Sequence, residues 1–193
     1  MDRVARLASR NPHKLDELRA ALPGWRLEPW DGGPLPPEEG STYHDNARVK
    51  AEAGRSSERW SLGEDSGLEV EGLAGGPGIL SARFAGPGED PVAKLLAQLD
   101  GMTARAREAR YVCELVAISP AGDEVRATGL LRGRIAAEAR GSEGFGYDPV
   151  FVPTGEQRTV AELGNAWKRE HSHRAMAAQA LLAAVGSDLL EAT

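Results

Sequence analysis

The sequence predicts an α/β protein with a mixed β-sheet, and three observations lead to this fold class. The chain begins with a strand and a helix, contains a long β-hairpin in its middle, and ends with a helix. A strand–helix start is typical of parallel pairing, whereas a hairpin introduces antiparallel pairs into the same sheet. With 193 residues, of which 41% are hydrophobic, the chain can form a single domain over residues 1–193 with a substantial core.

The N-terminal third is predicted to alternate strands with helices. Asn11 and Pro12 begin the first helix, because Asn can cap free N–H groups and Pro suits the first helical position. Leucines at positions 15, 18 and 22 give this helix one apolar face. The predicted elements are strands over 3–9 and 25–30, helices over 12–22 and about 41–55, and a glycine- and proline-rich loop over 31–40.

An acidic pair, Glu64-Asp65, follows a short apolar run. We expect a strand to end near this pair, because a strand end that opens onto a glycine loop is a common place for metal ligands at a sheet edge. Residues 156–167 carry no clear pattern. The other predicted elements are a helix over 90–100, hairpin strands over 109–118 and 124–136, a short strand over 149–152 and a last helix over 172–185 that stops at Gly186.

Composition and charge argue against several classes of partner. The chain has 29 acidic and 23 basic residues and a net charge of −6, which disfavours attachment to nucleic acid or to a membrane surface. Cys113 is the only cysteine, so an intrachain disulfide is impossible and a buried, inert thiol is expected. No apolar run approaches the ~20 residues of a membrane span, and the N-terminus is too charged for a signal peptide. We therefore expect a cytoplasmic protein.

Cationic side chains lie at the starts of two predicted helices, where free N–H groups and the helix dipole favour anions. Lys14 lies in the first turn of the first helix, against the usual charge preference there. Lys168, His173 and Arg174 lie before and at the start of the last helix. These positions suit phosphate binding; the alternative is a set of surface cations on ordinary capped helices.

Carboxylates occur in two adjacent pairs, Glu38-Glu39 and Glu64-Asp65. Mg²⁺ prefers hard oxygen ligands and is usually held by one or two carboxylates together with substrate phosphates. Neighbouring residues of a strand face opposite sides, so only one member of the second pair can be a direct ligand. We favour Asp65, which stands beside Ser66. A carboxylate at this position could also take a proton from an attacking water molecule.

The loop Gly144–Asp148 places glycines on both sides of an aromatic ring. Close backbone approach would let Phe145 stack on a nucleobase, with Asp148 as an acceptor. The alternative is a tight turn with Phe145 and Tyr147 in the core. Taken with the cations and carboxylates, and with no cysteine or serine-elbow nucleophile, this loop indicates a Mg²⁺-dependent site for a nucleoside phosphate.

Five blocks along the chain together resemble the inosine/xanthosine triphosphate pyrophosphatases, which hydrolyse noncanonical purine nucleoside triphosphates. The match spans nearly the whole chain, and the order of the blocks makes it far more specific than any single block. The blocks are SRNPHK (9–14), EEGSTYHDNARVKA (38–51), EDSGLEVEGLAGGPGILSARFAG (64–86), GFGYDPVF (144–151) and KxxxSHR (168–174).

The resemblance implies an elongated α/β fold with a long mixed sheet, two lobes around a central cleft, and usually a homodimer. It also implies a Mg²⁺-dependent reaction in which water attacks the α-phosphorus of ITP, dITP or XTP. The products would be the nucleoside monophosphate and pyrophosphate, so that the enzyme cleanses the nucleotide pool. Mg²⁺ and three lysines would offset a triphosphate charge of about −4.

The resemblance also implies a role for each matching residue. Asp65 would be the proton acceptor and, with Glu38, a Mg²⁺ ligand, and the ring of Phe145 would stack on the base. The implied substrate contacts are Ser9, Arg10, Asn11, Pro12, His13, Lys14 and Lys50 for the triphosphate, Ser66 for the substrate, Phe145, Gly146, Tyr147 and Asp148 for the base, and Lys168, His173 and Arg174 for base and phosphate.

Two positions depart from the family pattern. Arg10 fills a place that is usually Gly or His, so its side chain must point away from the phosphates or add a charge to them. The usual Glu-Glu-Thr-Gly is one residue short at 38–40, and we prefer Glu38 over Glu39 for the metal. Competing functions are a pyrophosphatase for modified pyrimidine nucleotides, a nucleotide-binding regulator without turnover, and a nucleic-acid-binding module.

Overall fold

The computed structural model describes residues 3–191, with side chains as far as Gly186. The strands are β1 (Arg3–Leu7), β2 (Trp25–Glu28), β3 (Trp60–Val70), β4 (Glu108–Ile118), β5 (Glu124–Ile135) and β6 (Phe151–Pro153). The helices are α1 (Pro12–Ala21), α2 (Tyr43–Ala53), α3 (Pro91–Gln98), α4 (Val160–His171) and α5 (His173–Glu191), with 3₁₀ turns η1 (Glu71–Leu73), η2 (Gly78–Arg83) and η3 (Arg105–Arg107).

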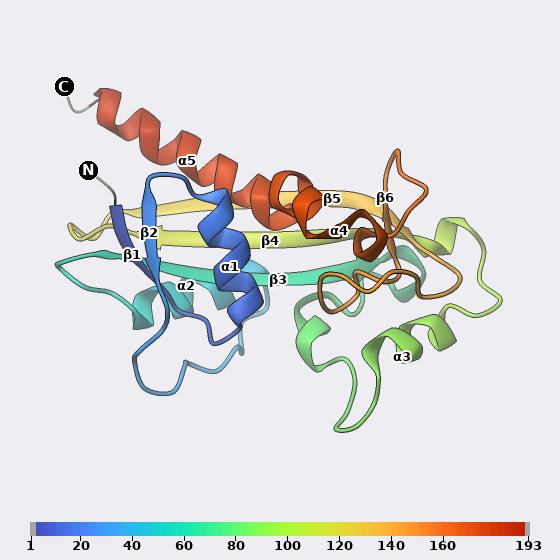
Figure 1. Ribbon diagram of the computed structural model, residues 1–193. Coiled ribbons are helices and arrows are strands. Elements are labelled where there is room, and N and C mark those ends of the chain that lie inside the picture. The colour runs from blue at the N-terminus through green and yellow to red at the C-terminus, as the bar shows by residue number, and fades with distance from the viewer. Residues whose placement is uncertain (1–2, 192–193) are drawn as a thin grey trace. The chain divides into compact units, whose positions relative to one another are not determined.

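The strands form one mixed sheet in the order β2-β1-β3-β4-β5-β6 (Figure 1). β1 pairs in parallel with both β2 and β3, whereas β5 and β6 are antiparallel. A short turn between Ser119 and Asp123 joins β4 to β5, as the hairpin prediction requires. The predicted fold class, α/β with a mixed sheet and flanking helices, is confirmed.

The chain divides into two compact units. Unit 1 comprises the described residues of Met1–Asp65, Cys113–Gly129 and His173–Thr193, and unit 2 comprises Ser66–Val112 and Leu130–Ser172. β3, β4 and β5 each contribute residues to both units. The single domain and the cleft between two lobes stay predictions.

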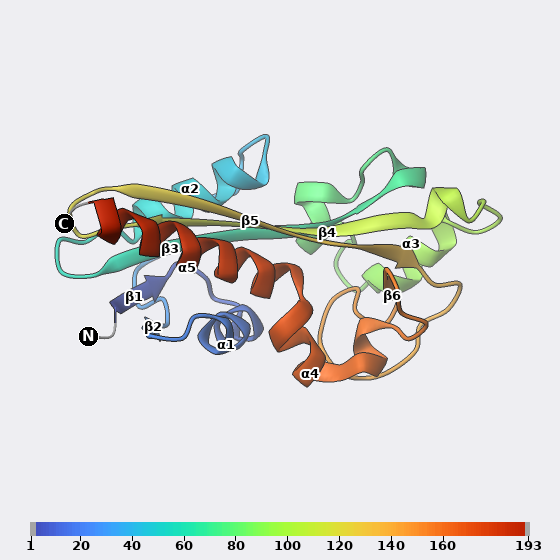
Figure 2. The ribbon, with the colours of Figure 1, turned by 90° about the horizontal axis from the view of Figure 1, so that it is seen from above.

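Unit 1 has helices on both faces of its strands: α1 and α5 lie on one face and α2 on the other (Figure 2). The predicted apolar face of α1 is confirmed, because Leu15, Leu18 and Leu22 are buried in the larger core beneath α1 and α5. A smaller cluster joins Ala47 and Ala51 of α2 to buried residues of β4.

Unit 2 contains α3, α4, β6 and the 3₁₀ turns. α3 begins at Pro91 after the cap Asp90, as predicted, and buries Leu95 and Leu99. The rings of Tyr111 on β4 and Phe151 on β6 pack with their centroids 4.5 Å apart.

The prediction that a strand ends at the acidic pair is wrong. β3 runs without a break from Trp60 to Val70, so Glu64 and Asp65 lie in its middle, and its place between β1 and β4 makes it an inner strand. The alternating residues Leu68 and Val70 belong to the same strand, and both of their side chains are fully buried. The carboxylates are therefore presented by a rigid strand and not by a loop.

One helix was not predicted from the sequence, and the predicted end of another is wrong. α4 occupies most of the segment for which no structure was predicted, and it begins with a capping box between Thr159 and Glu162. Its interior is broken at Gly164 (φ 87°, ψ 174°), which obscures the helical periodicity. α5 continues past Gly186, where the prediction ended the helix. A glycine ends a helix mainly when its φ is positive, and Gly186 does not have a positive φ.

Candidate active site

Glu64 and Asp65 on β3 face opposite sides of the sheet, as the strand period predicts. Glu64 contacts Lys14 of α1 and Arg174 of α5, which belong to one layer of unit 1. Asp65 contacts Asn46 and Lys50, which belong to α2 on the other layer. The acidic pair thus forms two clusters of different composition.

The Glu64 cluster is a buried ion network. One carboxylate oxygen lies 2.6 Å from Lys14 Nζ and the other 3.1 Å from Arg174 Nε. Arg174 is also buried and pairs with Glu17 through a second guanidinium nitrogen. Burial pushes the pKa of Glu64 upward, but Lys14 and Arg174 outweigh it and hold that pKa well below its usual value.

The thiol of Cys113 lies 3.6 Å from a Glu64 oxygen. Burial and the Glu64 charge raise the pKa of Cys113 well above its usual value. The expected buried thiol is confirmed, and its high pKa keeps it protonated and therefore a weak nucleophile.

The Asp65 cluster links two predicted site residues through one ammonium group. Lys50 Nζ lies 2.6 Å from Glu38 Oε1 and 3.5 Å from Asp65 Oδ1. Asn46 Nδ2 donates to Asp65 Oδ2 at 3.0 Å. Burial raises the pKa of Asp65, although Lys50 and Asn46 act against it. Burial alone would lower the pKa of Lys50, but Asp65, Glu64 and Glu38 raise it above its usual value.

The approach of α2 to β3 sets the geometry of this cluster. A Cβ atom at Gly63 would overlap the carbonyl oxygen of Ala47, so the helix backbone lies directly against the strand. Thr42 caps the helix and forms a capping box with Asp45, which fixes where α2 begins. Asn46 and Lys50, one turn apart on α2, consequently lie beside Asp65.

The N-terminal end of α1 is partly occupied by its own cap. Asn11 Oδ1 accepts from the His13 N–H, and the Asn11 N–H donates to Ser9 Oγ. Pro12 is the first residue of the helix, as predicted. Arg10 donates to the carbonyl of Gly33 in the following loop, which gives its bulky side chain a partner outside the helix terminus.

We expected three lysines to offset the charge of a triphosphate, but the structure pairs each of these lysines with a carboxylate. Lys14, Lys50 and Lys168 are each already paired with a carboxylate. In unit 1, the cations Lys14, Lys50 and Arg174 face four carboxylates, namely Glu17, Glu38, Glu64 and Asp65. Within the described residues, the Glu64 and Asp65 clusters together therefore have no surplus positive charge for an anion of about −4.

In unit 2, the predicted base-contact residues gather around Asp148. This carboxylate is buried and accepts from Lys168 Nζ at 2.7 Å, from the Phe145 N–H at 2.8 Å and from the Tyr111 hydroxyl at 3.3 Å. The Lys168 ammonium also lies 4.3 Å from the centre of the Phe145 ring. One face of that half-buried ring is thus covered by a cation, so a stacked base would use the other face.

Other predicted contact residues differ in exposure. Tyr147 is buried and donates its hydroxyl to the Ser81 carbonyl at 3.0 Å, and burial raises the pKa of Tyr147 to about 12. Gly146 is exposed with φ 62°, Ser66 is half-buried in β3, and His173 is buried as the first residue of α5.

Five residues of these clusters were not predicted as site residues: Glu64, for which Asp65 was preferred, Cys113, which was expected to be inert, and Asn46, Glu17 and Tyr111. The i, i+4 spacing of Asn46 and Lys50 places both on one face of a helix, and that signal could have identified Asn46. Glu17 and Tyr111 carry no comparable signal, because their partners are distant in sequence.

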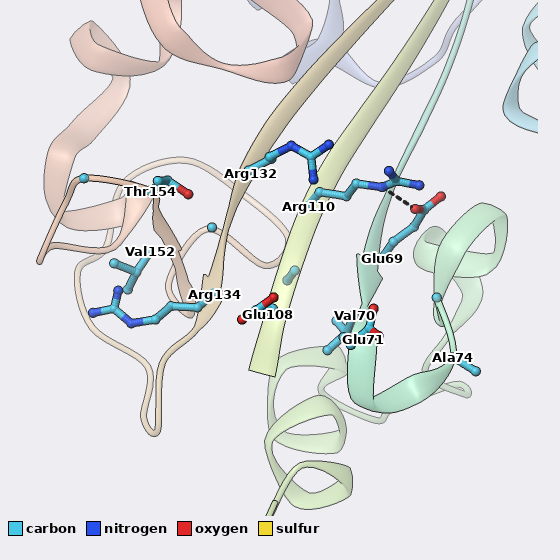
Figure 3. Close-up of a pocket in the computed structure, with 14 residues that line it drawn as sticks. Glu69, Val70, Glu71, Ala74, Glu108, Arg110, Arg132, Arg134, Val152 and Thr154 are labelled. Atoms are coloured by element: carbon cyan, nitrogen blue, oxygen red, sulfur yellow. Dashed lines mark hydrogen bonds and ion pairs between the residues drawn. The ribbon is translucent and has the colours of Figure 1, made fainter. Parts of the chain in front are cut away.

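A cavity of about 740 Å³ lies in unit 2 and is lined by residues of that unit (Figure 3). Arg110, Arg132 and Arg134 line it together with three glutamates, and Arg110 pairs with Glu69 at 2.6 Å. The charges of the three arginines and the three glutamates cancel. Within the described chain, none of the predicted site residues lines this cavity. This cavity therefore does not coincide with the site that the sequence predicts.

The residues around Lys50 fit a magnesium ion. Glu38 and Asp65 direct carboxylate oxygens at one cationic group, and Mg²⁺ usually takes only one or two carboxylates in addition to substrate phosphates. Among the described residues, no group of three or more His, Cys, Asp or Glu side chains could hold a metal ion by itself. Glu38 is half-buried whereas Glu39 is exposed, which favours the preference for Glu38.

Within residues 3–191, no helix is both long and apolar enough to cross a membrane.

Comparison with known proteins identifies relatives over nearly the whole chain. The family model described as "Ham1 family" matches residues 5–184. A dITP/XTP pyrophosphatase of Bdellovibrio bacteriovorus is 48% identical over 151 residues, which is 76% of each chain. A dITP/XTP pyrophosphatase of Mycobacterium bovis is 46% identical over 193 residues and covers 94% of each chain. The solved structure of a HAM1 protein from Coxiella burnetii has a TM-score of 0.84 at 31% identity and covers 96% of this chain and 99% of its own.

Proposed function

Because the chain belongs to the Ham1 family, we propose that it hydrolyses the noncanonical purine nucleoside triphosphates ITP, dITP and XTP. The products are the nucleoside monophosphate and pyrophosphate, and the reaction removes these nucleotides from the cellular pool. Two of the relatives named above are called dITP/XTP pyrophosphatases. The observation that carries the proposal in this chain is the Asp65 cluster, in which a buried carboxylate lies between an amide donor and a lysine.

Asp65 is the general base of the proposed reaction. It accepts a proton from water as the water oxygen attacks the α-phosphorus, and the bond from that phosphorus to the pyrophosphate leaving group breaks. Burial raises the pKa of Asp65, which makes the carboxylate a better proton acceptor than an exposed aspartate. Its position in the middle of β3 keeps it fixed during the reaction.

Magnesium is the proposed cofactor, and Glu38 and Asp65 are its proposed protein ligands. Bound there, Mg²⁺ would neutralise phosphate charge and stabilise charge that develops in the transition state. The balanced ion pairs of unit 1 support this proposal, because the cluster needs an added cation before it can accept a triphosphate. With these two carboxylates holding the metal, Lys50, which pairs with both, would be available to contact a phosphate oxygen.

Phosphate and base contacts are assigned to separate clusters. We assign the triphosphate to the start of α1, including Ser9, Asn11 and Lys14, and to Lys50. We assign the base to the Phe145–Asp148 loop and Lys168. The remaining proposed contact residues are Arg10, Pro12, His13, Ser66, His173 and Arg174. A homodimer in the cytoplasm completes the proposal, on the resemblance alone.

The test is pyrophosphate release from ITP, XTP, GTP and ATP with Mg²⁺, with orthophosphate assayed in parallel. We expect pyrophosphate from ITP and XTP and little from GTP or ATP, with turnover abolished in a folded Asp65→Asn variant. Orthophosphate alone would place the cleavage at the terminal phosphate and overturn the proposal. Binding of ITP without any product would identify a regulator instead of an enzyme.

A further inference from the structure

Asn46 of α2 is the one amide side chain of the Asp65 cluster, and both of its ends are used. Its Nδ2 donates to Asp65 Oδ2 at 3.0 Å, and its Oδ1 accepts from the Gly40 N–H at 2.9 Å. The side chain is fully buried, at 0% exposure. A buried amide is costly unless it is hydrogen-bonded, and both of these bonds go to segments of the proposed site.

The partners also fix the orientation of the amide. An oxygen must face the Gly40 N–H, and an N–H must face the Asp65 carboxylate, because the flipped amide would set like groups against each other at both ends. Asp65 Oδ2 is therefore held by Asn46, and Oδ1 is the oxygen that faces Lys50 at 3.5 Å. Asn46 thereby fixes the rotation of the Asp65 carboxylate, with Oδ1 directed toward Lys50.

The other end of Asn46 holds the segment that carries Glu38. A Cβ atom at Gly40 would lie 2.5 Å from Asp45 Cβ and 2.7 Å from Asn46 Oδ1, so the loop backbone lies directly against the start of α2. Glu38 is two residues before this contact and pairs with Lys50 on the same helix. One side chain thus fixes Asp65 relative to the Glu38–Gly40 segment.

We infer that Asn46 is a positioning residue for the hydrolysis: it orients Asp65 and keeps the Glu38–Gly40 segment in place beside it. This inference rests on the proposed function. Asn46 touches neither substrate nor the transferred proton; it acts through its two partners. Loss of a hydrogen-bonding partner of a metal ligand, which Asp65 is proposed to be, typically reduces metal affinity or activity by about 10–100-fold.

Two substitutions separate the two bonds. Asn46→Asp keeps an acceptor for the Gly40 N–H but replaces the donor to Asp65 with a second carboxylate. Asn46→Ala removes both bonds. Asn165→Asp is the matched control, because it makes the same chemical change at an exposed position of α4.

The measurements are kcat and KM for ITP, with binding of a non-hydrolysable ITP analogue followed by calorimetry. We expect kcat to fall about 10–100-fold in Asn46→Asp and Asn46→Ala, with KM changed less than about threefold. Binding stoichiometry should remain that of the wild-type protein, which shows that the chains are native and that the loss is catalytic. Asn165→Asp should match the wild-type protein in all three quantities.

The outcomes distinguish this inference from the proposed function. If the wild-type protein releases no pyrophosphate from ITP, the proposed function itself is wrong. If the wild-type protein is active and Asn46→Asp retains kcat within about twofold, Asn46 does not position Asp65. A loss of activity that is matched by an equal loss of binding stoichiometry would assign Asn46 to folding alone and would also overturn the inference.

Discussion

The ring of Phe145 and the ammonium of Lys168 already form a contact 4.3 Å apart, which is the geometry of a cation–π pair. The ring is half-buried, so a nucleobase on its other face would complete a stack. Substitution of Phe145 therefore tests directly whether its ring contacts substrate or only packs in its loop.

We predict that Phe145→Ala raises KM for ITP. Loss of base stacking costs about 1–3 kcal/mol, which is roughly a 5- to 150-fold rise in KM. Phe84→Ala is the matched control, because Phe84 also has a lysine ammonium, that of Lys94, over its ring at 5.4 Å but lies outside the proposed site. An unchanged KM in Phe145→Ala would assign the ring to the core.

The buried carboxylate of Glu64 makes the free energy of unfolding depend on pH. Lys14 and Arg174 overcome the effect of burial and hold the pKa of Glu64 well below the ordinary 4.5. Between these two values the unfolded chain binds more protons than the folded one, so acid favours unfolding. The stabilisation is present above about pH 4.5 and is lost as the pH falls toward the folded-state pKa.

We predict that Glu64→Gln lowers the free energy of unfolding at pH 7 by about 3–5 kcal/mol, because it removes the carboxylate charge that the buried Arg174 shares with Glu17 and that pairs with the half-buried Lys14. The variant should also lose less further stability than the wild-type protein between pH 5 and pH 3. Urea unfolding across this range measures both effects, with the exposed Glu170→Gln as control. Parallel pH curves for Glu64→Gln and wild-type protein would contradict the depressed pKa.

At the scale of elements, the contact between α2 and β3 positions the Asp65 cluster. Gly63 lies against the backbone of α2 near Ala47, two residues before Asp65. Lys50 and Asn46 extend from the same helix, so any displacement of α2 moves both partners of Asp65 together.

We predict that Gly63→Ala destabilises the protein by at least about 1–3 kcal/mol, because the added methyl group would overlap the helix backbone. Activity per folded chain should fall as well. Gly33→Ala is the control, since a Cβ there meets no atom within 4 Å. Thermal unfolding of both variants is the measurement; equal stability would show that α2 moves away from β3 without cost.

At the scale of the whole molecule, charge decides how the substrate can bind. The chain carries a net charge of −6, and the lysines of the proposed site are paired with carboxylates. A triphosphate in this site therefore meets lysines whose charges are already offset, which favours an added cation.

We predict that removing divalent cations with EDTA abolishes pyrophosphate release from ITP and that Mg²⁺ restores it. NaCl at the same ionic strength should not restore activity, because screening cannot replace a cation bound between Glu38 and Asp65. Circular dichroism should be unchanged by EDTA, since the clusters pair within the protein. A full rate of hydrolysis in EDTA would contradict the proposed role of Mg²⁺.

Local sequence signals predicted most of the elements. Asn11-Pro12 and Asp90-Pro91 marked the starts of α1 and α3, and the hairpin was clear from its two apolar runs. α4 was missed because its signal is short, a capping box followed by a break at Gly164, and the periodicity on which helix prediction depends is interrupted there.

By itself, the sequence determined the fold class, most of the elements, the opposite facing of Glu64 and Asp65, and the family resemblance, because each depends on local spacing or on motif order. Only the tertiary structure decided the partners: that β3 continues through the acidic pair, that each lysine of the site is paired with a carboxylate, and that Asn46 joins Gly40 to Asp65. Such partners are brought together by the packing of helices on strands, which no local pattern specifies.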